Sequence, residues 1–371
     1  MTIPSVYIGL MSGTSLDAVD AVAVNVEHNN FNLIGSFCQP IPNPLRTAIL
    51  QLCDPEQGSV EMLTETDYLL GKLYAATALK LIETLGLNAS QVAAIGCHGQ
   101  TVRHIAPGDG EITTSLQIGN ANILCADTGI PVVADFRRKD MALNGQGAPL
   151  VPAFHRQIFS SNEKNRVILN IGGIANITVL PKDGRCLGFD TGPGNMLMDI
   201  WSQTHLGKAY DNGGEWATSG SVQAQLLKEF KRCDFFSQPP PKSTGRELFN
   251  QQWLDKQLAN YADISPQDVQ ATLLALTTET ICDAINGLEN AVEEVYVCGG
   301  GAFNCKLMSA LDITLSQARV TSTEVLGIAP NWVEACAFAW LAKQRIEGKP
   351  GNIKEVTGAS RETVLGALYL P

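Results

Sequence analysis

Short apolar runs alternate with turns of Gly, Ser, Thr and Asn along much of this chain, a pattern typical of an α/β protein. Two apolar runs, at residues 6–10 and 18–26, predict strands on either side of a turn, and residues 31–38 predict a third strand. Apolar residues then recur at steps of three and four over residues 44–53 and 60–85, which predicts helices. The chain therefore opens with a predicted β-meander followed by helices.

The middle of the chain repeats the layout of its beginning. AAIGCHGQTV and IPVVADFRRKD predict two more strands, the first ending in a Gly-rich loop and the second in a charge cluster. RVILNIGGIANITVL, residues 166–180, then has the same order as the opening: apolar strand, Gly/Asn turn, apolar strand. We interpret the two stretches as a degenerate internal repeat.

Strands and helices continue to alternate in the second half. GFDTGPGN leads from a strand into a helix, and EEVYVCGGGAFNCKLMSAL predicts strand, triple Gly and helix. Helical spacing covers residues 222–232 and 267–290, and VEACAFAWLAKQR predicts a strongly apolar helix. The Pro-rich stretch SQPPPKSTGREL predicts a rigid loop, followed by a helix that Ser243 or Thr244 caps.

Length and composition narrow the class of protein. A chain of 371 residues exceeds the size at which one core stops growing, about 250–300 residues, so two lobes are expected. The net charge of -11 argues against a nucleic-acid surface. The ten cysteines form no C-x-x-C pair and lie mostly in apolar runs, as in a reducing compartment. With no basic leader and no membrane-length apolar run, we expect a soluble cytoplasmic protein.

Four Gly-rich turns each follow a predicted strand. They are Ser12-Gly13-Thr14, Gly172-Gly173, Thr191-Gly192-Pro193-Gly194 and Gly299-Gly300-Gly301. Any one of them could merely end a strand, but ligands of α/β sheets bind at the carboxyl ends of strands, so four turns predict a shared cleft. Their backbone N–H groups would suit a polyphosphate. No Walker A motif is present and no G-x-G-x-x-G follows a strand, which disfavours a P-loop kinase and a Rossmann dehydrogenase.

Three carboxylates lie next to these turns. Asp17, Asp20 and Asp190 could hold Mg²⁺ through water or take a proton from a nucleophile. For Asp17, a turn cap is an equally good interpretation. For Asp190 the functional interpretation is favoured, because the surrounding GFDTGPGN can neither form a core nor start a plain helix.

Further polar residues have both a structural and a functional interpretation. His98, after a buried strand, is more often a hydrogen-bonded structural group than a catalyst. Arg137 or Arg138 could bind a substrate carboxylate, whereas Lys139 and Asp140 are expected on a solvated face. The carboxylate of Glu334, in an apolar helix, could bind a substrate hydroxyl. Alternatively, it could simply be favoured near a helix N-terminus by the helix dipole.

Nine motifs in order resemble the anhydro-N-acetylmuramic acid kinase family. They are IGLMSGTSLD, HGQTV, ADFRR, GQGAPLVP, LNIGGIAN, GFDTGPGNMLMD, KSTGRE, CGGGA and VEACAFAWLA, and the resemblance runs from about Val6 to the C-terminal GASRETVLGALYLP. It implies a two-lobed actin-like ATPase (ribonuclease H-like) α/β fold with duplicated mixed β-sheet domains flanked by helices. We place the first lobe at residues 1–135, with 345–371 packing back on it, and the second at 136–344.

The resemblance also implies a reaction. ATP and water convert 1,6-anhydro-N-acetylmuramic acid into N-acetylmuramic acid 6-phosphate and ADP in peptidoglycan recycling, with Asp190 as the base on water. Asp17 and Asp190 would hold Mg²⁺ through water. The residues that would bind the sugar are His98, Arg137, Arg138 and Glu334, but the resemblance does not decide which of the two arginines does so. The implied nucleotide site comprises Gly13, Thr14, Ser15, Leu16, Asp17, Ala18, Val19, Asp20, Gly172, Gly173, Gly192, Gly194, Gly299, Gly300 and Gly301.

Three positions depart from the family pattern. Ala18 stands where Gly is usual, and Phe303 and Cys305 stand where His and Pro are common, which affects local nucleotide contacts rather than the reaction. We expect a homodimer that acts on small molecules and has no nucleic-acid or membrane partner. Two alternatives are an actin-like or chaperone-like ATPase that binds proteins, and a sugar-binding or hydrolase module without ATP.

Overall fold

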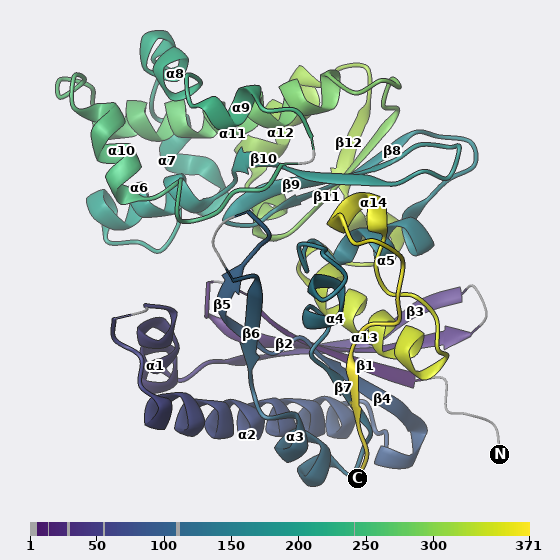
Figure 1. Cartoon of the computed structure of the whole chain (residues 1–371). Helices are drawn as coiled ribbons and strands as arrows, with labels where there is room; N and C mark the ends of the chain where they lie inside the picture. Colours follow the sequence, from purple (N-terminus) through teal and green to yellow (C-terminus); the bar gives the residue numbers. More distant parts are fainter. Residues whose placement is uncertain (1–5, 14, 28–29, 55, 109–111, 241) are drawn as a thin grey trace. The chain divides into compact units, whose positions relative to one another are not determined.

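A computed structural model of the chain describes residues 6–13, 15–27, 30–54, 56–108, 112–240 and 242–371. Its contacts divide it into two compact units, labelled by element in Figure 1. Residues 1–158 and 332–371 form the first unit, and residues 159–331 form the second. The division differs from the predicted boundaries after residues 135 and 344. Helix α13 (Val333–Ile346) belongs to the first unit because it packs against strands of that unit's sheet.

A six-stranded sheet forms the centre of the first unit, in the order β13-β7-β4-β1-β2-β3. Its strands are β1 (Val6–Ser12), β2 (Ala18–Glu27), β3 (Asn30–Pro40), β4 (Val92–Cys97), β7 (Val132–Ala134) and β13 (Ala367–Tyr369). The strands β1, β2 and β3 pair antiparallel, which confirms the predicted meander. β4 runs parallel to β1 and β7 parallel to β4, while β13 joins β7 antiparallel.

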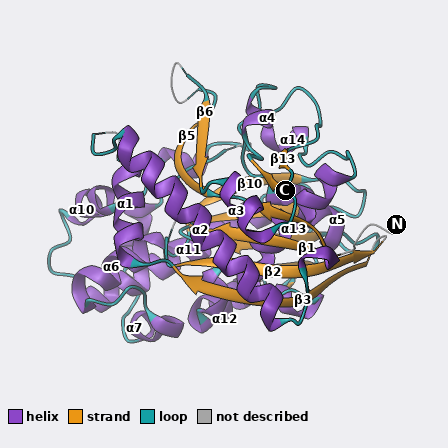
Figure 2. Ribbon diagram, turned by 90° about the horizontal axis from the view of Figure 1, so that it is seen from below, coloured by secondary structure: helices purple, strands orange, loops and turns teal. Residues whose placement is uncertain are grey.

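Helices cover both faces of this sheet. Ile8 and Leu10 of β1 share a core cluster with Leu70 and Tyr74 of α2 (Val60–Thr84), which runs across one face in Figure 2. Gly9 lies between them and therefore points to the opposite face, where α13 packs. A Cβ on Gly9 would collide with the carbonyl oxygen of Ala335. The glycine thus lets α13 approach the backbone of the sheet.

The remaining elements of the first unit include a hairpin that the sequence pattern did not predict. Strands β5 (Gln100–Ile105) and β6 (Thr114–Ile118) pair antiparallel where a Gly-rich loop was expected. The helices are α1 (Asn43–Cys53), η1 (Ala89–Gln91), α3 (Ala121–Thr128), α4 (Arg138–Met141), α5 (Val151–Phe159) and α14 (Lys354–Thr357). α5 runs one residue past the boundary between the units.

A five-stranded sheet forms the centre of the second unit, in the order β10-β9-β8-β11-β12. Its strands are β8 (Arg166–Ile171), β9 (Ile174–Leu180), β10 (Leu187–Pro193), β11 (Glu294–Cys298) and β12 (Arg319–Ser322). β8, β9 and β10 pair antiparallel, and β11 and β12 run parallel to β8.

The two sheets therefore repeat one topology. In both, the first five strands in chain order lie as third, second, first, fourth, fifth, with a three-stranded meander followed by two parallel strands. This repetition confirms the internal repeat and the fold class expected from the sequence: duplicated mixed sheets flanked by helices, the actin-like, ribonuclease H-like α/β fold.

Helices of the second unit surround its sheet. They are α6 (Met196–Leu206), η2 (Asn212–Gly214), α7 (Glu215–Thr218), α8 (Ala224–Phe230), α9 (Asp234–Ser237), α10 (Gln251–Leu258), α11 (Pro266–Asn286), η3 (Gly300–Phe303), α12 (Cys305–Thr314), η4 (Thr323–Leu326) and η5 (Pro330–Trp332), which ends in the first unit. Nowhere in the described ranges is a helix long and apolar enough to cross a membrane. All ten cysteines are described, and none of them forms a disulfide.

The helix predicted directly after Ser243 and Thr244 is absent: residues 242–245 have no regular structure, and residues 246–250 form turns and bends. The next helix, α10, begins at Gln251, and its cap is the side chain of Asn250, which accepts from the Trp253 N–H at 2.9 Å. The prediction was wrong because Ser243 and Thr244 hydrogen-bond to a distant carboxylate instead of a helix N-terminus.

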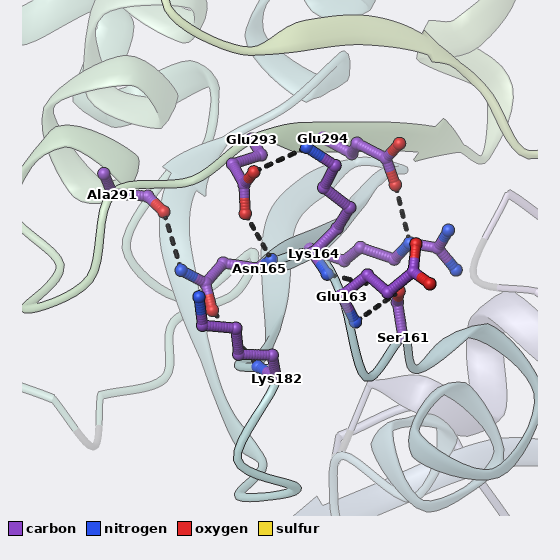
Figure 3. Close-up of polar contacts among 9 residues, drawn as sticks. Ser161, Glu163, Lys164, Asn165, Lys182, Ala291, Glu293 and Glu294 are labelled. Atoms are coloured by element: carbon purple, nitrogen blue, oxygen red, sulfur yellow. Dashed lines mark hydrogen bonds and ion pairs between the residues drawn. The ribbon is translucent and has the colours of Figure 1, made fainter.

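A polar clamp at the amino ends of β8 and β11 fixes the register of these parallel strands (Figure 3). The Asn165 N–H donates to Glu293 Oε2 at 3.1 Å, and Lys164 Nζ donates to Oε1 of the same carboxylate at 2.7 Å. Arg166 Nε donates to Glu294 Oε2 at 2.7 Å, across the pair that faces in the ladder. The Gly-rich turns lie at the opposite, carboxyl ends of these two strands.

Candidate active site

Two Gly-rich turns of the second unit pack directly on one another. Gly172 and Gly173 turn the chain between β8 and β9, and Gly194 follows β10. The Gly194 N–H donates to the Gly173 carbonyl and the Asn195 N–H to the Gly172 carbonyl, both at 2.8 Å. A Cβ on Gly194 would collide with the Gly172 carbonyl oxygen. Only glycine therefore permits this approach.

The triple-Gly turn lies against the same strand end. Gly299 follows β11 with a φ of 78°, and a Cβ there would lie 2.5 Å from Asn170 Oδ1 at the end of β8. At Gly300 the nearest atom to such a Cβ is Asn195 Nδ2 at 3.6 Å, an ordinary van der Waals contact, so this glycine is not tightly enclosed. Three of the four predicted turns thus converge at the carboxyl ends of β8 and β11. Backbone N–H groups of this kind can hold phosphate oxygens.

Asp190 lies in β10, two residues before Gly192, at an irregularity in the β9–β10 pairing. Its Oδ2 accepts from Ser243 Oγ at 3.0 Å and from the Thr244 N–H at 2.9 Å. No hydrogen bond from the described residues reaches Oδ1. Burial raises the pKa of Asp190 to about 6, although the two donors oppose the shift. A carboxylate with one held and one unpartnered oxygen suits a general base near neutral pH.

The first Gly-rich turn, between β1 and β2, belongs to the first unit. Thr14 lies outside the described residues. Leu16 has a φ of 57° and is only 2% exposed, so its buried side chain offsets the cost of a left-handed backbone. Val19 is fully buried and Ala18 half-buried, so neither presents a polar side-chain group. Ser15 is exposed, and its carbonyl accepts from Arg46 Nη2 at 3.4 Å.

Two carboxylates flank this turn. Asp17 is exposed, and its carbonyl accepts from the Ile41 N–H at 3.0 Å. Asp20 lies in β2, where burial raises its pKa to about 6 and a hydrogen bond with the Cys38 side chain opposes the shift. Among the described residues, no group of three or more His, Cys, Asp or Glu is arranged to bind a metal ion directly. Single carboxylates such as Asp17 and Asp190 fit water-mediated Mg²⁺ contacts, which need only one or two oxygens from protein.

His98 and Arg137 form one cluster in the first unit. Arg137 Nη2 and Nε donate to His98 Nε2 at 2.8 Å and 3.2 Å. His98 must therefore be neutral, with its proton on Nδ1. Burial and the Arg137 charge hold the pKa of His98 well below its usual range. His98 Nε2 is thus occupied as an acceptor for Arg137.

Glu334, in the first turn of α13, interacts electrostatically with Arg137 of this cluster. Burial raises the pKa of Glu334, the Arg137 charge lowers it, and Asp20 raises it. Its carboxylate accepts no hydrogen bond from any residue in the described ranges. A half-buried carboxylate without a donor is suited to accept one from a ligand hydroxyl.

The structure separates the two arginines that the sequence left open. Arg138 is exposed, and its Nη2 lies 2.7 Å from Asp135 Oδ2 in an ion pair. It lines a cavity of about 180 Å³ together with His98, but Arg137 and Glu334 are not part of that lining. Arg137, already desolvated, is therefore the better candidate for a substrate carboxylate.

Two features of the site escaped sequence reasoning. Ser243 and Thr244 were predicted to cap a helix, but they hold Asp190; the signal was the KSTGRE motif itself. Asp140 was expected on a solvated face, but it is fully buried, because three neutral donors satisfy its carboxylate. Lys139 is exposed, as expected.

Comparisons with known proteins identify the family of the chain. The family model described as anhydro-N-acetylmuramic acid kinase matches residues 5–371. Curated relatives with that name include proteins of Shewanella pealeana, 49% identical over 98% of both chains, and Shewanella amazonensis, 50% identical over 98% of both. A third, from Saccharophagus degradans, is 48% identical over 99% of this chain and 100% of its own. The chain therefore belongs to the anhydro-N-acetylmuramic acid kinase family.

Proposed function

We propose that the chain uses ATP and water to open 1,6-anhydro-N-acetylmuramic acid and to phosphorylate its O6, with Asp190 as the base. The observation that carries this proposal is the Asp190 carboxylate: Oδ2 is fixed by two donors, Oδ1 has no partner among the described residues, and the strand leads into the Gly-rich turns. The products are N-acetylmuramic acid 6-phosphate and ADP, and the reaction serves peptidoglycan recycling.

Asp190 draws a proton from water, whose oxygen attacks the anomeric carbon. The bond between that carbon and O6 breaks, and O6 takes the electron pair. O6 then forms a bond to the γ-phosphorus as the bond to the β–γ bridging oxygen breaks, which releases ADP. With a pKa of about 6, Asp190 is mostly ionised at pH 7 and still basic enough to accept the proton.

The Gly-rich turns are the proposed phosphate-binding groups. Gly173, Gly300 and Gly301 would present backbone N–H groups at the ends of β8 and β11, which stabilise negative charge without reorganisation. The N–H groups of Gly172, Gly194 and Gly299 instead donate to backbone carbonyls and shape these turns. In the first unit, Gly13, Ser15 and the backbone up to Asp20 provide the equivalent hairpin. Asp17 in the first unit and Asp190 in the second are each proposed to make a water-mediated contact to Mg²⁺, which would neutralise charge on the phosphates.

Arg137 and Glu334 are the proposed sugar contacts. Arg137 would bind the lactyl carboxylate of the sugar, and Glu334 would accept a hydrogen bond from a hydroxyl or amide group. His98 supports Arg137 by accepting two of its N–H groups. Arg138, paired with Asp135, is proposed to have no such role.

A coupled assay for ADP, run with ATP, Mg²⁺ and a panel of anhydro and ordinary amino sugars, tests the function. ADP formation should require 1,6-anhydro-N-acetylmuramic acid, and Asp190→Asn should abolish it. ADP formed equally well without sugar would instead support the alternative of an actin-like or chaperone-like ATPase, which no present observation favours.

The proposal extends to the setting of the enzyme. Ten cysteines without a disulfide support a reducing compartment, for which we propose the cytoplasm. A homodimer rests on the family resemblance alone. Light scattering on the purified chain would measure its mass against the 39.8 kDa of one chain.

A further inference from the structure

Asp140 is a buried carboxylate that the proposed reaction does not use. It is 0% exposed, although its neighbours Arg138 and Lys139 in α4 are exposed. The Gly147 N–H donates to Oδ2 at 2.9 Å, and Asn352 Nδ2 and Thr357 Oγ1 donate to Oδ1 at 2.7 Å each. Three donors explain how a charge can be buried here, because a carboxylate without partners would be too costly. They do not explain why a carboxylate occupies the position.

Gly147 connects Asp140 to the sugar-binding cluster. Its N–H binds Asp140, and its carbonyl oxygen accepts from Arg137 Nη1 at 2.8 Å. Gly147 has a φ of 69°, and a Cβ there would lie 2.7 Å from Met141 Cγ. The backbone at Gly147 therefore has a left-handed conformation that favours glycine. Its N–H donates to Asp140, and its carbonyl oxygen accepts from Arg137.

Two acceptors together orient the Arg137 guanidinium. His98 Nε2 accepts from Nε and Nη2, and the Gly147 carbonyl accepts from Nη1. Bidentate recognition of a carboxylate needs a fixed guanidinium plane. If Gly147 shifts, only the His98 contact remains, and the plane can rotate about it.

The C-terminal segment supports the same turn. Asn352 and Thr357 hold Asp140, and the Gln146 N–H donates to the Thr357 carbonyl at 2.8 Å. Resting on the proposed role of Arg137, we propose that Asp140 is a positioning residue for recognition of the sugar carboxylate. It fixes Gly147, whose carbonyl orients Arg137.

Asp140→Asn tests this positioning role, because it keeps the shape but presents an N–H₂ group in place of one accepting oxygen. We expect the KM for 1,6-anhydro-N-acetylmuramic acid to rise about tenfold, with the KM for ATP unchanged and kcat within about twofold. For 1,6-anhydro-N-acetylglucosamine, which lacks the lactyl carboxylate, the variant should have little effect. An equal loss for both sugars would show that Asp140 acts on stability alone and would overturn the proposal.

Thr357→Val is the matched control. It removes a donor to Oδ1 but leaves the Asp140–Gly147 hydrogen bond, so it should lower the melting temperature without raising the KM for the charged sugar. If Asp140→Asn does not fold, Gly147→Ala, which displaces the same turn through Met141, takes its place with the same expected selectivity loss. An unchanged KM ratio of the two sugars in the folded variant would contradict the proposal.

Arg137→Ala separates this proposal from the proposed function. If it leaves the KM ratio of charged to neutral sugar unchanged, the role of Arg137 itself is wrong. If Arg137→Ala removes the preference for the charged sugar and Asp140→Asn does not, the role of Arg137 stands and the positioning role of Asp140 is wrong.

Discussion

Asp190 has its two carboxylate oxygens in different environments, and this asymmetry gives the first prediction. Ser243 and the Thr244 N–H hold Oδ2, which leaves Oδ1 for the proton of water. We expect Asp190→Asn to lower kcat by about 10²–10⁴-fold, because an amide cannot accept the proton. Its melting temperature should stay close to that of the unmodified chain. A variant that keeps more than a tenth of the activity would remove Asp190 from the role of base.

The same residue predicts a pH dependence. Burial raises the pKa of Asp190 to about 6, and a base must be ionised to act. Activity should therefore fall as pH drops through 6, by about tenfold for each further unit of pH. Ser243→Ala removes a donor that stabilises the charged form, so its acid limb should move to higher pH. A limb that stays in place in Ser243→Ala would show that another group titrates.

At the scale of single residues, the sequence indicated which residues are functional candidates better than it indicated what surrounds them in the fold. Asp190 and Glu334 could be singled out because each is a carboxylate in an unsuitable setting for a solvated charge. Arg137 and Arg138 are adjacent and chemically equal, and only the fold decides that one contacts His98 and the other Asp135. Asp140 was misplaced because its donors Asn352 and Thr357 lie more than 200 residues away.

Helix α13 depends on glycine for its position, which gives a prediction about stability. A Cβ on Gly96, the partner of Gly9 in the β1–β4 ladder, would collide with the Phe338 carbonyl oxygen in α13. Gly96→Ala should destabilise the fold by about 1–3 kcal/mol through overpacking. It should also raise the KM for the sugar, because Glu334 lies in the first turn of this helix.

Gly58→Ala is the control for this substitution in urea unfolding. Gly58 is exposed, and a Cβ there would meet its nearest neighbour at 3.4 Å, an ordinary contact. Its effect should stay within about 0.5 kcal/mol. Equal unfolding midpoints for Gly96→Ala and Gly58→Ala would contradict the close packing of α13.

Element by element, periodicity predicted the strongly patterned segments and failed where tertiary contacts decide. The meander of β1–β3, helix α2 and the repeat at β8–β9 follow from apolar spacing alone. The β5–β6 hairpin lacks a continuous apolar run, since Arg103 and His104 lie within β5. Ser243 and Thr244 matched a helix cap in sequence, but Asp190 competes for their hydrogen bonds.

For the whole molecule, ligand binding should raise the free energy of unfolding. A ligand that binds only the folded chain and is present at 100 times its dissociation constant adds about 2.7 kcal/mol to the free energy of unfolding. ATP with Mg²⁺ should therefore raise the melting temperature of both the unmodified chain and Asp190→Asn, because the phosphate-binding backbone does not need that carboxylate. No shift with ATP would contradict the proposed phosphate-binding role of the Gly-rich turns.

The central claim for the whole molecule is that water opens the anhydro ring while O6 receives the phosphoryl group. The reaction run in water enriched in heavy oxygen tests this directly, with the products analysed in fragments before the anomeric oxygen exchanges. The label should appear on the anomeric hydroxyl of N-acetylmuramic acid 6-phosphate, and its phosphoryl group should carry none. Label in the phosphoryl group or in free phosphate would show that water attacks ATP, and would contradict the mechanism.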